Sequence, residues 1–62
     1  MLTFEVVQQK AYFNPRKYVA RVYRDGVRID DSAFVGNDGR SVRACAIHWA
    51  HKRMAQLFNT GV

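Results

Sequence analysis

The chain lacks the covalent links and the membrane-directed segments that many small proteins depend on. Its single cysteine, Cys45, cannot form an internal disulfide, and this cysteine usage is typical of a reducing compartment. No apolar run approaches the roughly 20 residues of a membrane span. The N-terminus lacks the charged region, apolar stretch and cleavage site of a signal peptide. We therefore expect one cytoplasmic domain, residues 1–62, that does not bind a membrane.

Acidic residues are also scarce. The 62 residues contain ten Lys or Arg against five Asp or Glu, which gives a formal net charge of +5. Glu5 and Lys10 cancel within residues 1–15, so all of the excess lies in residues 16–62. Arginine outnumbers lysine, and its planar guanidinium group suits phosphates and base edges. The charge indicates a polyanionic partner, although ordinary solubility accounts for it equally well.

What the chain does contain is a clear pattern of strands followed by a helix. In Leu2–Gln8 the apolar residues Leu2, Phe4 and Val6 alternate with Thr3, Glu5 and Val7, a period of two that is typical of a strand. Lys17–Arg24 and Val27–Phe34 flank Asp25-Gly26, the preferred two-residue turn of a β-hairpin. From roughly Arg40 to Asn59 the apolar residues recur at helical spacing. The sequence predicts an α+β fold in which a three-stranded antiparallel sheet packs on one C-terminal helix, in the order β-β-β-α.

The hairpin turn also predicts which side chains share a face of the sheet. A two-residue loop places Tyr23 opposite Arg28 and Arg21 opposite Asp30. The expected core side of the hairpin then carries Tyr18, Ala20, Val22, Val27, Ile29 and Ala33. The expected outer side carries Val19, Arg21, Tyr23, Arg28, Asp30 and Ser32. This register leaves Asp31 on the core side, near its edge, where it meets either a cation from the helix or the free edge of the sheet.

The helix is expected to begin with a cap and to bury one stripe. Asp38 or Ser41 can accept a hydrogen bond from an unpaired N–H group at its start. The stripe consists of Val42, Ala46, Ala50, Met54 and Leu57, with Ile47 and Phe58 alongside. We expect this stripe to pack on Leu2, Phe4, Val6, Val22 and Ile29.

Few residues have the spacing that catalysis or metal binding requires. Cys45, His48 and His51 follow one another at i, i+3 and i+6, but a structural zinc site needs four ligands and no second pair exists elsewhere. A Cys45–His48 pair on a helix has no oxyanion hole, and so small a domain offers little cleft. Asp30 and Asp31 are adjacent in a strand and so point to opposite faces. We expect no catalytic residue, metal or cofactor, and hence a non-enzymatic protein.

Basic residues on the outer side of the sheet are the main candidates for binding. Tyr23 stands between Arg21 and Arg28, and a sheet with arginines can enter the major groove of duplex DNA. Arg40 and Arg43 open the helix, where the N-terminal dipole also favours phosphates. The expected nucleic-acid-binding residues are Arg16, Lys17, Arg21, Tyr23, Arg24, Arg28, Arg40 and Arg43. The alternative is an ordinary solvated surface.

Three aromatic residues suggest a second kind of partner. Tyr12 and Phe13 fall in the expected loop of residues 8–17, and Trp49 lies at the rim of the helical stripe. Trp49 either packs at the edge of the core or contacts a partner. The alternative function is a small protein-interaction module that uses these side chains, or an open strand edge, against an acidic host protein. A homodimer joined edge to edge through the sheets is a further alternative.

The stretch KYVARVYRDGVRIDDSAFVGNDGRSVRACAIHWAHKRM resembles the arm-type N-terminal DNA-binding domain of phage and transposon tyrosine recombinases. The matching parts are the hairpin strands YVARVYR and VRI, Phe34, and the alanine-rich helix from near Ser41. Domains of that family place a three-stranded sheet on one helix and insert the sheet face into the major groove. The resemblance implies that Arg21, Tyr23 and Arg28 contact DNA.

The opening of the helix, GRSVRACA, is similar to the C-terminal half of double-stranded-RNA-binding domains. That resemblance implies that Arg40 and Arg43 bind phosphates, so RNA stays open as a partner. The chain departs from this family because it lacks the N-terminal helix, and its loop QKAYFNPRK lacks the usual Gly-Pro and His. It also lacks the recombinase catalytic domain. A free-standing protein of this kind looks like a phage or mobile-element regulator that binds DNA, or that binds and disables a host protein.

Overall fold

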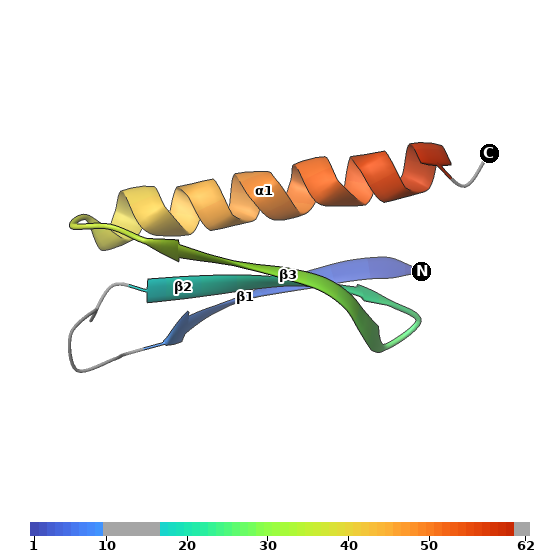
Figure 1. The fold of residues 1–62 in the computed structure, drawn as a ribbon, viewed down its shortest axis with the longest axis horizontal. Helices are drawn as coiled ribbons and strands as arrows, with labels where there is room; N and C mark the ends of the chain where they lie inside the picture. The colour runs from blue at the N-terminus through green and yellow to red at the C-terminus, as the bar shows by residue number, and fades with distance from the viewer. Residues whose placement is uncertain (10–16, 61–62) are drawn as a thin grey trace.

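The computed structural model describes residues 1–9 and 17–60. Three strands, β1 (Leu2–Gln9), β2 (Lys17–Arg24) and β3 (Val27–Val35), form an antiparallel sheet in the order β1-β2-β3. The helix α1 (Gly39–Thr60) follows and lies along one face of this sheet (Figure 1). The predicted fold class and element order are confirmed.

The hairpin between β2 and β3 has the predicted turn. Asp25 and Gly26 both adopt positive φ angles, 53° and 84°, as the central residues of a tight hairpin turn do. The backbone N–H of Asp25 donates to the carbonyl oxygen of Met1 at 2.9 Å, and the Met1 ammonium group binds the Asp25 carboxylate. The start of β1 is therefore tied to the hairpin tip.

Asp38 caps the N-terminus of α1. Its Oδ1 accepts a hydrogen bond from the backbone N–H of Arg40 at 3.1 Å, and its Oδ2 accepts one from the hydroxyl of Ser41 at 2.8 Å. Of the two predicted caps, Asp38 is therefore the one used. The connection from β3 passes close to the helix, since a Cβ at Gly36 would lie 2.6 Å from Cγ2 of Val42.

The core between α1 and the sheet is built from small side chains. Ala20, Ala46 and Ala50 are fully buried where α1 crosses β2, and Val22 is the largest fully buried side chain. Larger side chains pack around this contact and are only half-buried: Phe4, Val6, Tyr18, Phe34 and Trp49. Alanines let the helix approach the sheet closely, but they contribute little buried apolar area. The core of a single chain is therefore thin.

A β-bulge in β3 changes the predicted register. Tyr23 lies opposite Arg28, as predicted, but Val22 lies opposite Asp30, so Ile29 is an extra residue without a partner in β2. The predicted pairing of Arg21 with Asp30 is wrong, because Arg21 lies opposite Asp31. Side chains alternate along a strand, so one inserted residue moves every later side chain of β3 to the opposite face.

The bulge accounts for both aspartates. Asp30 turns to the helix side, where its Oδ2 accepts a hydrogen bond from Nε of Arg53 at 2.6 Å. Asp31 turns outward, with its Oδ2 lying 3.7 Å from Nη1 of Arg28. Val27, also predicted to lie in the core, is 65% exposed beside the hairpin turn. The predicted core positions of Ile29 and Ala33 are wrong too, because both are exposed. Their places on the helix side are taken by Asp30, Ser32 and Phe34.

The Asp30–Arg53 pair should couple β3 to α1 measurably. Both side chains are partly exposed, at 32% and 39%, so we expect a coupling free energy of only about 0.5–1 kcal/mol. A double-mutant cycle with Asp30→Asn and Arg53→Gln, measured by urea unfolding, tests this value. The matched cycle with Arg28→Gln and Asp31→Asn should give a coupling near zero, because that pair is longer and more exposed. Equal coupling in the two cycles contradicts the assignment.

Candidate nucleic-acid interface

The face of the sheet away from α1, called the outer face below, is not covered by any described residue. The registers of both strand pairs place on it Thr3, Glu5 and Val7 of β1, Lys17, Val19, Arg21 and Tyr23 of β2, and Arg28, Asp31 and Ala33 of β3. Val19 is buried in its middle, between Val7 and Ala33. The prediction that Arg21, Tyr23 and Arg28 share one uncovered face is confirmed.

On the outer face, the carboxylate of Glu5 binds two side chains of the neighbouring strand. Nη1 of Arg21 donates to Oε1 of Glu5 at 3.2 Å, and the Tyr23 hydroxyl donates to the same oxygen. The hydroxyl of Tyr23, followed by the guanidinium of Arg21, lowers the pKa of Glu5 below its ordinary value of 4.5. The same bond to Glu5 raises the pKa of the Tyr23 phenol. These contacts fix the position of Arg21. Its Nε is buried and has no hydrogen-bond partner, and no other buried side-chain polar atom of the described residues lacks one.

Glu5 is the residue of the outer face whose contacts the sequence did not reveal. The alternation along β1 places it on the same side as Thr3 and Val7, but not opposite any particular residue of β2. The sequence between the two strands contains no Asn-Gly or Asp-Gly pair, so it does not predict that register. The structure places Glu5 directly opposite Arg21.

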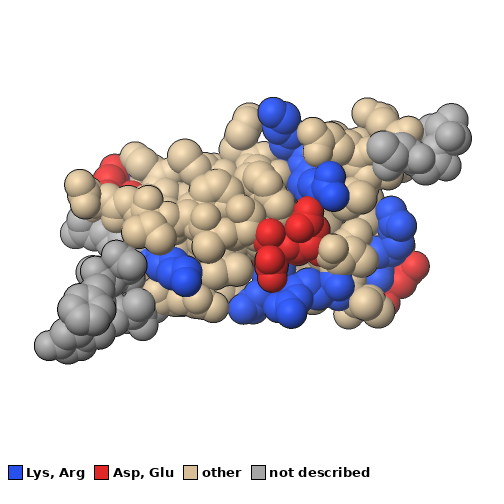
Figure 2. All heavy atoms as spheres, viewed as in Figure 1, with Lys and Arg blue, Asp and Glu red and all other residues tan. Residues whose placement is uncertain are grey.

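All five carboxylates of the chain are engaged within the protein. Glu5 binds Arg21 and Tyr23, Asp25 binds the Met1 ammonium group, Asp30 binds Arg53, Asp31 lies near Arg28, and Asp38 caps α1. The cations that have no ion pair with another described residue are Lys17, Arg24, Arg40, Arg43 and Lys52. In Figure 2, basic atoms surround a central acidic group and continue along the margin below the helix. The excess positive charge is therefore displayed on the surface.

The predicted basic residues do not form one continuous surface. Lys17, Arg21 and Arg28 share the outer face, but the register turns Arg24 to the helix side of the sheet, beside Leu2. Arg40 and Arg43 are exposed on the first turns of α1, in the other layer of the fold. Arg16, Tyr12 and Phe13 lie outside the described residues.

The remaining candidates of the helix have structural places. Trp49 is half-buried, with its ring centroid 6.3 Å from that of Phe34, so it packs at the edge of the core. His51 makes an edge-to-face contact with Phe4, with centroids 5.0 Å apart. Cys45 is exposed. Within residues 1–9 and 17–60, no three His, Cys, Asp or Glu side chains come together to hold a metal ion.

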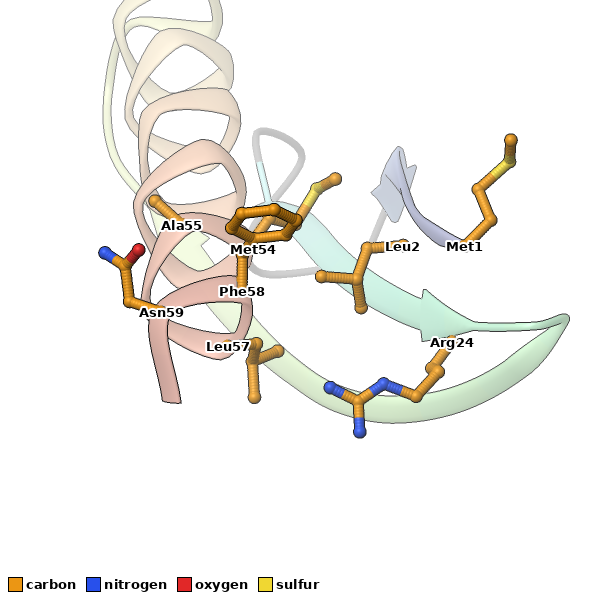
Figure 3. A pocket seen from close by; sticks show the side chains of 8 residues that line it. All are labelled: Met1, Leu2, Arg24, Met54, Ala55, Leu57, Phe58 and Asn59. Carbon is orange, nitrogen blue, oxygen red and sulfur yellow. The ribbon is translucent and has the colours of Figure 1, made fainter. Parts of the chain in front are cut away.

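An open apolar groove lies between the end of α1 and the start of β1 (Figure 3). Its volume is about 690 Å³, and it is lined by Met1, Leu2, Arg24, Met54, Ala55, Leu57, Phe58 and Asn59. Phe58, predicted to be part of the buried stripe, is 76% exposed, because the helix here extends beyond the closely packed part of the core. The helical spacing predicts on which side of the helix Phe58 lies, but it does not predict that the sheet ends before reaching it.

Comparisons with protein-family models, with curated proteins and with solved structures found no match. In the part of the chain that the structure describes, α1 is not apolar enough along its length to cross a membrane.

The low pKa of Glu5 predicts a pH dependence of stability. The unfolded chain takes up a proton at Glu5 near pH 4.5, whereas the folded chain does so only at lower pH. The stabilisation is therefore present above pH 4.5 and is lost as the pH falls through the lower, folded value. Glu5→Gln should unfold at a urea midpoint that falls less steeply than that of the wild type between about pH 5 and pH 3. Identical slopes for the two proteins contradict this interpretation.

Proposed function

We propose that this protein is a small, non-enzymatic nucleic-acid-binding module, which binds duplex DNA through the outer face of its sheet. The observation that carries the proposal is the distribution of charge. Internal contacts engage every carboxylate, while basic side chains on the surface have no ion pair with another described residue. A protein of net charge +5 with such a surface attracts phosphates strongly.

The dimensions of the outer face suit the major groove. Three strands about 4.8 Å apart make a ribbon about 10 Å across, and the major groove of B-DNA is about 12 Å wide. Lys17 and Tyr23 are six residues apart on β2, or about 20 Å, and Arg28 lies directly opposite Tyr23. Lys17 and Arg28 can therefore contact phosphates on the two sides of one groove. The deep, narrow major groove of duplex RNA does not admit such a ribbon, which favours DNA.

In the complex Arg21 would bind a DNA phosphate in place of the Glu5 carboxylate. In the free protein its guanidinium is bound to Glu5, and the Arg21 side chain is 25% exposed. A phosphate brought close by Lys17 and Arg28 competes with the Glu5 carboxylate for the same donors. Glu5 would then weaken binding to any duplex. The weakening would be larger on a duplex whose phosphates do not reach Arg21, because no phosphate there replaces the carboxylate as the partner of Arg21.

Duplex binding should depend steeply on salt and on the cations of the outer face. We expect Lys17→Gln and Arg28→Gln each to weaken binding by roughly three- to tenfold and to lower the slope of log affinity against log salt by about one, because each removes one phosphate contact. Fluorescence polarisation with a random duplex at several salt concentrations gives both numbers. Lys52→Gln, which removes the same charge from the exposed side of α1, is the matched control and should change affinity by less than about twofold. No binding at low salt would end the proposal.

Removing the competing carboxylate should strengthen binding. Glu5→Gln frees the guanidinium of Arg21 and raises the net charge by one, so we expect about three- to tenfold tighter binding in the same assay. Asp31→Asn raises the net charge equally but leaves the Glu5–Arg21 pair intact, so it separates the two effects. If Glu5→Gln gains no more than Asp31→Asn, Arg21 has a structural role only.

A further inference from the structure

We propose that a second copy of this chain pairs along the free edge of β1, so that two sheets join into one of six strands around a two-fold axis. The proposal rests on the strand edges and on the side of α1 above β1. It does not depend on DNA binding.

The two edges of the sheet differ in how they are protected. The edge strand β3 carries the bulge at Ile29 and three charged side chains, Arg28, Asp30 and Asp31, and these features discourage pairing with another strand. The edge strand β1 pairs regularly with β2 over its eight residues and contains no proline and no bulge. Its one charged side chain, Glu5, is held by Arg21 and Tyr23 on the outer face. Among the described residues, none covers the free edge of β1.

The side of α1 above β1 carries apolar side chains as well. His51 contacts Phe4, and Ile47 lies one turn before His51 on the same side of the helix. Further along, Met54 and Phe58 line the groove with Met1 and Leu2 (Figure 3). Apolar surface therefore continues from the open edge of β1 onto the helix.

The thin core favours a second copy as the occupant. Val22 is the largest side chain that a single chain buries fully, whereas Phe58 stays 76% exposed. Domains of this size often need oligomerisation for stability, and a two-fold interface uses the same self-complementary surface in both copies. Backbone groups of an unpaired strand bind another strand without any particular side chains, so the edge of β1 is complementary to itself.

The charge on β1 selects the register. Both helices lie on one side of the joined sheet only if the two-fold axis passes through a residue of β1. An axis at Glu5 would oppose two like charges, which is unfavourable. An axis at Val6 instead pairs Glu5 with the partner's Val7 and Phe4 with the partner's Gln8. The axes at Glu5 and Val6 are the two that pair the most residues of β1 (Leu2–Gln9) with the partner. We therefore place the axis at Val6, which joins the two outer faces into one continuous surface.

Substitutions of Val7 by residues of opposite charge test the interface and its register. Val7→Glu would face the partner's Glu5 twice, so we expect the dimer dissociation constant, measured by sedimentation equilibrium, to rise roughly tenfold. Val7→Lys should lower it a few-fold, because lysine then faces that glutamate. Ala33→Glu is the matched control: Ala33 lies opposite Val19 on the β3 side, as Val7 does on the β1 side, and its substitution should leave the constant within about twofold.

Two further measurements complete the test. Dimerisation should strengthen with added salt, because each copy carries +5, whereas duplex binding weakens, so the two proposals fail separately. Hydrogen exchange at the β1 amides should slow as protein concentration rises, while exchange in β3 stays unchanged. Hydrogen exchange of the wild type still tests the proposal if circular dichroism shows that Val7→Glu does not fold. A chain that stays monomeric at millimolar concentration, or equal effects of Val7→Glu, Val7→Lys and Ala33→Glu, would overturn the proposal.

Discussion

The extra residue in β3 determines how the charges of this small protein are arranged. Without the bulge at Ile29, Asp30 would face outward beside Arg21, and Asp31 would lie under the helix. With it, Asp30 reaches Arg53 of α1 and Asp31 joins Arg28 on the outer face. The bulge therefore links the sheet to the helix and leaves Glu5 as the partner of Arg21. The positions of the two aspartates follow from this one irregularity, whereas Arg21, Tyr23 and Arg28 lie on the outer face with or without it.

Local signals in the sequence were sufficient for the elements but not for all of their contacts. The Asp25-Gly26 turn has one favoured geometry, and the alternation in β2 placed Arg21 and Tyr23 correctly. The bulge has no such signal, because Ile29 fits a regular strand as well as it fits an extra position. The pairing of Glu5 with Arg21 depends on the register of β1 against β2, and the sequence between these strands contains no Asn-Gly or Asp-Gly pair that would predict it. The bulge moved the side chains of β3 that follow Ile29 to the opposite face without changing the fold.

The charge distribution connects the structure with both proposals. The chain as a whole is strongly basic because it has ten Lys or Arg and only five Asp or Glu. The carboxylates are also engaged locally, at a turn, the helix cap and the contact with the helix, and so lie beside only some of the cations. The same positive charge that attracts a duplex opposes the approach of a second copy, and both forces weaken with salt. In a dimer the two outer faces would lie side by side, so a duplex bound along them could itself offset the repulsion between the copies.

The contact between α1 and β2 has a mechanical consequence. Ala20, Ala46 and Ala50 meet through methyl groups, which form a smooth surface with no ridge to stop the helix from sliding along the strand. The position of the helix must therefore be set from its two sides. The ring of His51 against Phe4 fixes the side toward β1. The contacts of Trp49 with Phe34 and of Arg53 with Asp30 fix the side toward β3. These larger side chains on both sides therefore keep the helix from sliding along the strand.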